Sequence, residues 1–424
     1  MRWPGCILLL AIPLAAQSPA RPLTLEQAIA AGLAHNPRIA AARHDLEAAD
    51  ARIKIARAEL YPRITFGAIA KSGLAGATNA LGLVGLPNSP FYRNFAASLN
   101  LSQTVFDFGR RAAVIDAERR SRDAAAADLA DMEASVKIGI ERAYWRLLRG
   151  QRLRGIAADV LKARNATVRQ AEIFYDAQYR SHVDVDAARF ALASVERRVG
   201  EQEAEVERLS AELSAAMGTE QTNIYTLPDE SLEIHPPGAI SELVELAFLH
   251  RPDLEALRAR RQVAEANLRF ARSLRRPSLH LALTGGYARV PSLLLQALTA
   301  AGAGFTAPVF TGGSIDGQIE SATAQLASLS SQEEAMRQRM ALEVRSALLA
   351  YQEKSAALAE FASRVALTRA TLRLATERHR EGIASGVELN NANAEFTGSL
   401  VQREAARIDV QIARADLLFS TGQL

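Results

Sequence analysis

The sequence has 424 residues, enough to bury a sizeable core and, by length alone, to form two or three domains. Its formal net charge is only +3, and no cluster of Lys and Arg is interleaved with aromatic residues, so nucleic acid is not indicated as a partner. Aromatic residues make up only 6% of the chain, which argues against a conventional globular core.

Residues 1–20 are predicted to be an export signal. Arg2 precedes an apolar run, and small residues suited to cleavage follow around Ala16 or Ala20. The run is too short to span a bilayer as a helix, which takes about 20 residues. Cys6 is the only cysteine and lies inside this segment, so the mature chain has none for disulfide, thiolate-metal or nucleophilic chemistry.

The rest of the chain contains an internal duplication. The segment HNPRIAAARHDLEAADARIKIARAELYP, from His35, matches HRPDLEALRARRQVAEANLRFARSLRRP, from His250, at an offset of 250 − 35 = 215. Further along, Gly109 matches Gly313 at an offset of 313 − 109 = 204. The shift of 215 − 204 = 11 residues indicates that one connection in each repeat varies in length, as exposed loops do.

These matches predict a signal at 1–20, a first structural repeat at 21–220, a linker at 221–239 and a second repeat at 240–424. Each repeat opens with a helix that a proline ends, at position 62 or 277. We interpret the two equivalent histidines, 35 and 250, as residues at the start of these helices rather than as catalytic groups. The apolar positions that form an a/d seam in the first of these helices are Ile39, Ala42, Leu46, Ala49, Ile53, Ala56 and Leu60.

Two segments with alternating apolar and polar residues follow in each repeat. They predict strands at about 62–70 and 95–106 in the first repeat, and at about 277–287 and 299–310 in the second. Each strand is about ten residues long, the length that crosses a bilayer when tilted. The four strands of one chain would form an open sheet, and a membrane tolerates no unpaired edge, so several copies must share one barrel.

A helical stretch of unusual length comes next. Residues 109–181 and 313–385 would each reach roughly 100 Å as one helix. A short turn then precedes a second helix of about 35 residues, which Gly218 or Gly422 closes as a C-terminal glycine. We therefore predict a mainly α fold with a small β part, in which an internally duplicated chain carries long coiled-coil helices and four transmembrane strands.

Enzyme chemistry is not predicted. The seven histidines are scattered, no pair has metal-ligand spacing beside a third ligand, and no phosphate loop or nucleophile elbow occurs. We predict neither a cofactor nor a metal site. One alternative uses the same helical seams: a soluble periplasmic coiled-coil adaptor or scaffold protein. It would have no use for four alternating segments placed symmetrically in two repeats.

Three features carry a family resemblance: the junction LSQTVFDFGRR, the paired HNP…LYP and HRP…RRP blocks, and the turn YRSHVDVDAARFAL. In these the chain resembles the TolC family of outer-membrane efflux proteins. The resemblance implies a homotrimer with a twelve-stranded β-barrel in outer-membrane lipid and an α-helical tunnel through the periplasm. The linker would lie in the equatorial region of that tunnel.

The resemblance also implies function. Members of this family are passive exit ducts that dock onto a periplasmic adaptor, or membrane fusion, protein and an inner-membrane pump of the RND, ABC or MFS type. Such ducts serve tripartite efflux or type I secretion, and their substrates are drugs, metals, small metabolites or secreted polypeptides. On the same resemblance, Phe106 and Gly109, with Gly312 and Gly313 in the second repeat, would form the junction between barrel and tunnel.

The turns between the paired helices match the family's periplasmic tips. By position, the resemblance implies gate residues and adaptor-contacting residues there. The gate residues would be Asp184, Glu388, Asn391 and His379. The adaptor contacts would be Gly382, Ile383, Ser385, Tyr179 and Ser181. A simpler role stays open for the two acids, which can cap the helices that begin after the tip serines.

Overall fold

In the computed structural model, the described residues are 21–73, 92–179, 181–220, 223–228, 238–289, 297–381 and 383–424. The predicted signal, Gly382 and most of the predicted linker lie outside them. The chain divides into two compact units. The strand unit is Ala41–Asp131 with Arg251–Met340, and the tip unit is Met1–Ala40, Met132–His250 and Ala341–Leu424.

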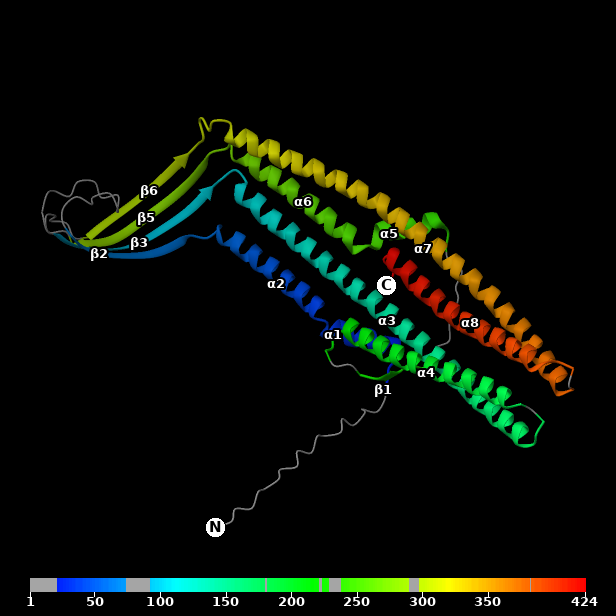
Figure 1. Cartoon of the computed structure of the whole chain (residues 1–424). Helices are drawn as coiled ribbons and strands as arrows, with labels where there is room; N and C mark the ends of the chain where they lie inside the picture. The colour runs from blue at the N-terminus through cyan, green and yellow to red at the C-terminus, as the bar shows by residue number, and fades with distance from the viewer. Residues whose placement is uncertain are drawn as a thin grey trace, which may run out of the picture. The chain divides into compact units, whose positions relative to one another are not determined.

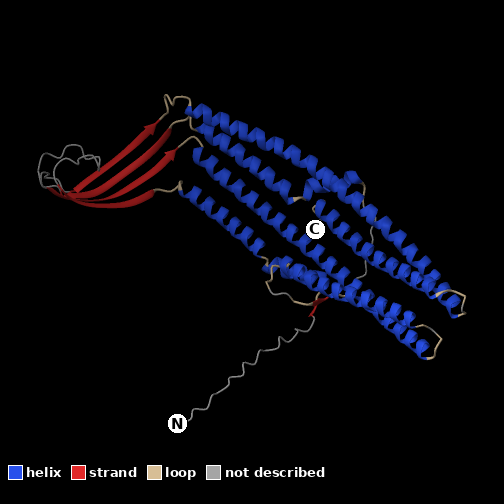
Figure 2. Cartoon of the chain, in the orientation of Figure 1, coloured by secondary structure: helices blue, strands red, loops and turns tan. Residues whose placement is uncertain are grey.

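The element order repeats, with equal helix lengths of 11, 22, 67 and 35 residues in the two halves (Figure 1). The first half contains α1 (Leu25–His35), α2 (Pro37–Ala58), β2 (Arg63–Gly73), β3 (Tyr92–Phe106), α3 (Arg110–Asp176) and α4 (His182–Ala216). The second contains α5 (Ile240–His250), α6 (Pro252–Ser273), β5 (Ser278–Arg289), β6 (Ala297–Thr306), α7 (Ser314–Arg380) and α8 (Gly386–Ser420). Helices predominate over strands (Figure 2), so the predicted fold class and the duplication are confirmed.

Each half opens with two helices where the sequence predicted one. His35 and His250 are the last residues of α1 and α5, and the Nδ1 atom of His35 lies 3.1 Å from the Ala31 carbonyl oxygen. Both histidines thus end a short helix that the sequence did not predict, two residues before the predicted helix starts at Pro37 or Pro252. The break follows from Pro37, because a proline disfavours the helical region for the residue before it, and Asn36 accordingly has a ψ of 122°.

The four strands of the strand unit form one antiparallel sheet in the order β2-β3-β5-β6. Strands from the two repeats therefore pair directly at its centre, where Leu101 lies opposite Leu283. A separate two-stranded parallel sheet in the tip unit joins β1 (Arg21–Pro22) to β4 (Tyr225–Thr226).

The register places apolar and polar side chains on opposite faces of the four-stranded sheet. One face carries exposed apolar residues at mutually opposite positions: Ile64, Phe66, Leu99, Leu279, Leu281, Leu283 and Phe305. On the other face, the Thr284 hydroxyl donates to the Asn100 side-chain oxygen at 2.9 Å, and His280 Nε2 lies 3.0 Å from the Thr306 hydroxyl. An apolar face toward lipid and a polar face toward a lumen is the pattern of strands in a membrane barrel.

The strand boundaries differ from the predicted ones at several ends. Strand β6 ends at Thr306, four residues earlier than predicted, and β3 begins at Tyr92 instead of 95. Pro308 explains the first difference, because it has no N–H for the ladder and restricts the residue before it. The exposed Val309 and Phe310 consequently lie outside the sheet.

Most of the predicted seam positions are buried or half-buried, whereas Leu60, which lies beyond the end of α2, is 48% exposed. In the tip unit Val136, Ile140, Tyr144 and Leu147 are each at most 3% exposed along α3. Gly32 of α1 packs closely on this seam: a Cβ there would lie 2.2 Å from Ile140 Cδ1, so the end of that side chain would have to shift. In the strand unit, Leu268 and Ala271 of α6 form a cluster with Ala322, packed by Ile319 and Leu326 of α7.

The helices α4 and α8 end as predicted on glycines with positive φ, 81° at Gly218 and 72° at Gly422. At the first end, the N–H of Gly218 donates to Ala215 and that of Thr219 to Ser214, so carbonyls of the last turn are satisfied. This pair of bonds is the Schellman motif.

Candidate functional site at the tips and the strand–helix junction

Both helix tips lie in the tip unit and present apolar side chains at equivalent positions. Tyr179 and Ile383 are 204 residues apart and are 83% and 64% exposed, and Val183 and Val387 are 73% and 68% exposed. An apolar side chain that stays exposed at a loop tip is not removed from water when the protomer folds, so it contributes no hydrophobic stabilisation. Four of them at matched places indicate a surface that contacts something outside the protomer.

Asp184 acts as a helix cap. The Ser181 backbone N–H and hydroxyl both donate to Asp184 Oδ2, at 3.3 and 3.4 Å, at the start of α4. The carboxylate thus sits at the positive end of the helix, where an anion is favoured. The capping alternative therefore has direct geometric support at this residue.

Glu388 is arranged differently. Ser385 caps α8 by accepting from the Glu388 N–H at 3.2 Å, and the Glu388 carboxylate instead accepts from Arg378 Nη1 of α7 at 3.3 Å. Both side chains of this ion pair are nearly half exposed. The carboxylate therefore links the two helices of its tip and stays accessible to solvent.

The other two predicted gate residues, His379 and Asn391, take no part in the hydrogen bonds of Asp184 and Glu388 described above. His379 is half-buried, with Nδ1 2.9 Å from the Ala384 carbonyl oxygen, and Asn391 is exposed on α8. The neighbour Asn390 instead accepts a 2.8 Å hydrogen bond from Arg164 of α3, which joins the first helix pair to the second. Sequence reasoning missed this link, since no local pattern marks a pair so distant along the chain.

One turn residue of the first tip has an unusual backbone conformation. Gln178 has a φ of 58°, in the left-handed region that glycine adopts without strain. Gly382 is the equivalent position by the offset of 204, and it lies outside the described residues.

At the junction, the predicted residues are turn residues between strand and helix. Gly109, Gly312 and Gly313 have φ values of 87°, 61° and 84°, which no strand or helix uses. Phe106 ends β3, and its ring lies edge-to-face on Phe108 with centroids 4.6 Å apart.

Asp107 organises this junction, and sequence reasoning missed it. Its buried carboxylate accepts from the N–H of Gly109 at 3.3 Å and from the N–H and Nε of Arg111 at 3.0 and 2.8 Å. Burial alone would raise the pKa of Asp107, but the hydrogen bonds and charge of Arg111 outweigh it and lower that pKa. An Asp just before a long helical stretch was the available signal.

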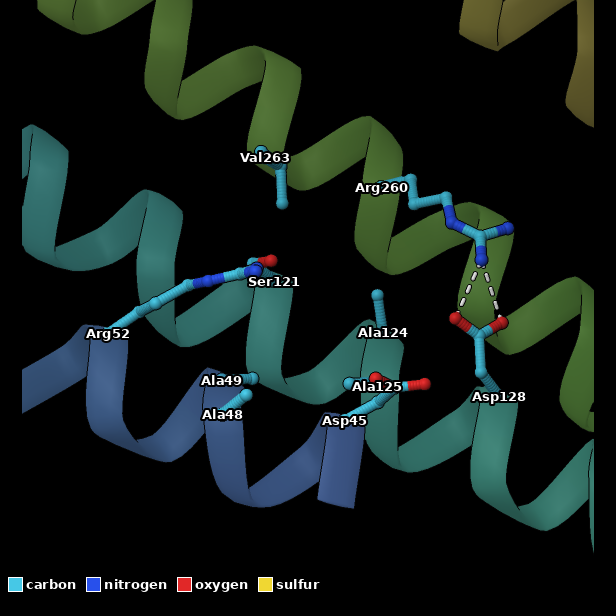
Figure 3. Close-up of a pocket in the computed structure, with 10 residues that line it drawn as sticks. All are labelled: Asp45, Ala48, Ala49, Arg52, Ser121, Ala124, Ala125, Asp128, Arg260 and Val263. Atoms are coloured by element: carbon cyan, nitrogen blue, oxygen red, sulfur yellow. Dashed lines mark hydrogen bonds and ion pairs between the residues drawn. The ribbon is translucent and has the colours of Figure 1, made fainter. Parts of the chain in front are cut away.

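A cavity of about 340 Å³ lies among α2, α3 and α6 of the strand unit (Figure 3). Arg260 donates twice to Asp128 across one side of it. Most of the other lining residues are small, and four of them are alanines: Ala48, Ala49, Ala124 and Ala125. These small side chains leave space between the helices. Among the described residues, no group of three side chains is placed to bind a metal ion.

A family model described as "Outer membrane efflux protein" matches residues 28–219 and 243–423, which is most of the chain and both repeats. The chain belongs to this family. The outer membrane efflux proteins are ducts rather than enzymes, and the alternative of a soluble adaptor or scaffold is therefore wrong. A search of curated proteins gave no match for this efflux protein.

Solved structures agree in fold. VceC of Vibrio cholerae is 21% identical over 94% of this chain and 96% of its own, with a TM-score of 0.79. The CmeC outer membrane channel of Campylobacter jejuni is 18% identical over 94% and 85%, with a TM-score of 0.81. The MtrE outer membrane channel of Neisseria gonorrhoeae is 20% identical over 94% and 88%, with a TM-score of 0.77.

The efflux protein is thus an exit duct of the outer membrane that extends into the periplasm. None of its helices, within the part of the chain that the structure describes, combines the length and the low charge needed to cross a bilayer.

Proposed function

We propose that three copies of this chain close a twelve-stranded barrel and a helical tunnel, forming the outer-membrane end of a tripartite efflux or type I secretion system. The sheet supports this assembly. Among the described residues, β2 pairs only with β3 and β6 only with β5, so each protomer has two free sheet edges that a neighbour can pair with. Edge-to-edge pairing between protomers would satisfy them all, as the membrane requires.

The tips are proposed to receive a periplasmic adaptor, which in turn connects to an inner-membrane pump of the RND, ABC or MFS type. The observation that carries this proposal is the matched pair of exposed residues, Tyr179 and Ile383. Ser181 and Ser385, two residues after them, are the N-cap residues of the next helices. Large exposed apolar and aromatic side chains are frequent anchors for a partner.

Glu388 is proposed to act in the gate, and Asp184 mainly as a cap. In a trimer three Glu388 carboxylates would form a ring, and a ring of acids favours cations. Opening would break the bond to Arg378 or carry both helices of the tip along together. Asn391 and His379 are proposed to line the same region.

Efflux measurements test adaptor docking. Ile383→Asp and Tyr179→Asp should each abolish drug export in cells while leaving heat-stable trimers in the outer membrane. Leu249→Asp is the matched control, since Leu249 is 75% exposed but lies in α5 away from the tips. Normal export by both tip variants would remove the docking assignment.

Planar-bilayer conductance tests the gate separately. Glu388→Gln should reduce cation preference, whereas Glu381→Gln, which changes another exposed acid directly after α7, should not. An unchanged reversal potential in the Glu388 variant would refute a gating role and leave the duct itself unaffected.

A further inference from the structure

A second cavity, of about 490 Å³, lies in the strand unit where β3 passes into α3 and α6 leads to β5. Its walls come from the start of α3 and the end of α6. The lining residues are Phe108, Gly109, Ala112, Ala113, Asp116, Arg269, Arg272, Ser273 and Arg276.

The cavity is positively charged. Three arginines and one aspartate line it, which gives a net charge of 3 − 1 = +2. Arg269 forms an ion pair with Asp116. Arg272 and Arg276 are exposed, and no described carboxylate lies within ion-pair distance of either. Two guanidinium groups therefore remain available to an anion from outside the chain.

The backbone carbonyl groups at the C-terminal end of α6 do not need hydrogen bonds from these two guanidinium groups. The carbonyls of Ser273 and Arg276 accept from Arg110 Nη2, each at 3.4 Å, and the Arg272 carbonyl accepts from the Arg275 N–H. The carbonyls that would make a helix end negative thus already have donors.

The side on which the cavity lies follows from the aromatic residues. Phe106 pairs in register with Leu279, on the apolar face that also carries Leu281. Phe108 lines the cavity, and its ring packs on that of Phe106. The cavity therefore lies beside the lipid-facing side of the sheet, at the end from which the helices leave. Aromatic residues next to arginines are typical of the boundary between hydrocarbon and headgroups.

We propose that this cavity binds the phosphate of an anionic phospholipid from the periplasmic leaflet of the outer membrane. Arg272 and Arg276 would hold the phosphate, since a planar guanidinium donates two parallel hydrogen bonds to its oxygens. The acyl chains would lie against Leu279 and Leu281. The site would fix the height of the barrel in the membrane at the point where each strand turns into the tunnel.

Lipid counting by native mass spectrometry of the detergent-solubilised protein tests this. Presented with equal amounts of phosphatidylglycerol and phosphatidylcholine of identical acyl chains, the native protein should retain phosphatidylglycerol preferentially. Arg272→Gln with Arg276→Gln should weaken that binding about thirty-fold, because each basic residue contributes about 1 kcal/mol, or roughly fivefold. Arg260→Gln is the control, because Arg260 carries the same charge on the same helix about 18 Å away.

Three results would overturn the proposal. The first is equal retention of both lipids by the native protein, which needs no variant and so stands even where the double variant does not assemble. The second is displacement of phosphatidylglycerol by millimolar inorganic phosphate, which would identify a site for a free anion. The third is retained preference in the double variant, which would place the lipid elsewhere.

Discussion

Phe108 and Gly312 occupy equivalent positions of the two repeats, 204 residues apart, and both have left-handed backbones, with φ of 51° and 61°. The same turn is thus made once by glycine and once by an aromatic residue. A left-handed conformation costs a non-glycine residue roughly 1–2 kcal/mol. The ring contact of Phe108 with Phe106 offsets part of that cost. Both repeats thus form the same left-handed turn, whether or not the residue at this position is glycine.

Substituting alanine for Gly312 should therefore destabilise the protein. No atom lies within 4 Å of a Cβ built there, so backbone strain of about 1 kcal/mol is the whole expected effect. Gly155→Ala, in an open part of helix α3, should have the opposite sign, a gain of roughly 0.5–1 kcal/mol. Thermal unfolding in detergent, followed by circular dichroism, measures both. Equal shifts of the two variants would contradict a left-handed turn at position 312.

Asp107→Asn should lower the unfolding free energy by about 1 kcal/mol, since the charge that Arg111 and the helix start require is lost. The lowered pKa of Asp107 gives a pH dependence with a definite sign. The folded protein holds the carboxylate ionised more firmly than the unfolded chain, so this stabilisation exists above the ordinary value of 3.8 and is lost as pH falls through the lower folded value.

The melting temperature as a function of pH checks this. The difference between the native protein and the Asp107 variant should be constant near neutral pH and shrink below about pH 4. Asp316→Asn removes the same charge from an exposed ion pair with Arg275 and should shift stability by less than about 0.5 kcal/mol.

Asp131→Asn should act in the other direction. Burial, and then the charge of Asp253, raise the pKa of Asp131, while Arg251 opposes them only in part. A raised folded pKa means that the ionised group penalises the folded state above that value, and the penalty disappears as pH falls below the unfolded one. The variant should be more stable at pH 7 by up to about 1 kcal/mol, and equal to the native protein near pH 3. A destabilised variant at pH 7 would refute this assignment.

Gly218→Ala should be more costly than Gly312→Ala. Its φ of 81° adds strain, and a Cβ would lie 2.8 Å from the backbone Cα of Asn36, which cannot swing aside. Asn36 also donates from its side chain to the Ala216 carbonyl, so a displaced chain loses this bond as well. We expect a loss of at least about 2 kcal/mol in the same thermal assay. A shift no larger than that of Gly312→Ala would show that the contact yields freely.

The sequence predicted long-period features well. The 204-residue offset located both 67-residue helices and both 35-residue helices, because a fixed seam tolerates no insertion. The sequence pattern did not predict the short helices α1 and α5. The predicted a/d seam belongs only to the helices that begin at Pro37 and Pro252, and it gives no sign of a further helix before each proline. The end of β6 was missed because alternation continues into Pro308, although its missing N–H ends the ladder.

At the tips, too, local features were predicted from the sequence and a long-range contact was not. Local signals identified Ser181 and Ser385 as the residues at which the second helices start, and the structure has both as N-caps. The bond from Arg164 to Asn390 could not be found this way, because it spans 226 residues and depends on how two helix pairs face each other. The resemblance suggested the docking and gating roles, and the structure adds the matched exposure of Tyr179 and Ile383 as support for docking.

The pairing of β3 with β5 has a consequence for how the duct is made. Each newly exported polypeptide carries a sheet that is complete at its centre and unfinished at β2 and β6, so a solitary copy cannot enter hydrocarbon without stranding amide groups there. Membrane insertion and oligomerisation must then occur together, and their rate depends on the concentration of other folded copies in the periplasm. A strain that exports too few copies should accumulate them on the periplasmic side, where proteases can reach them.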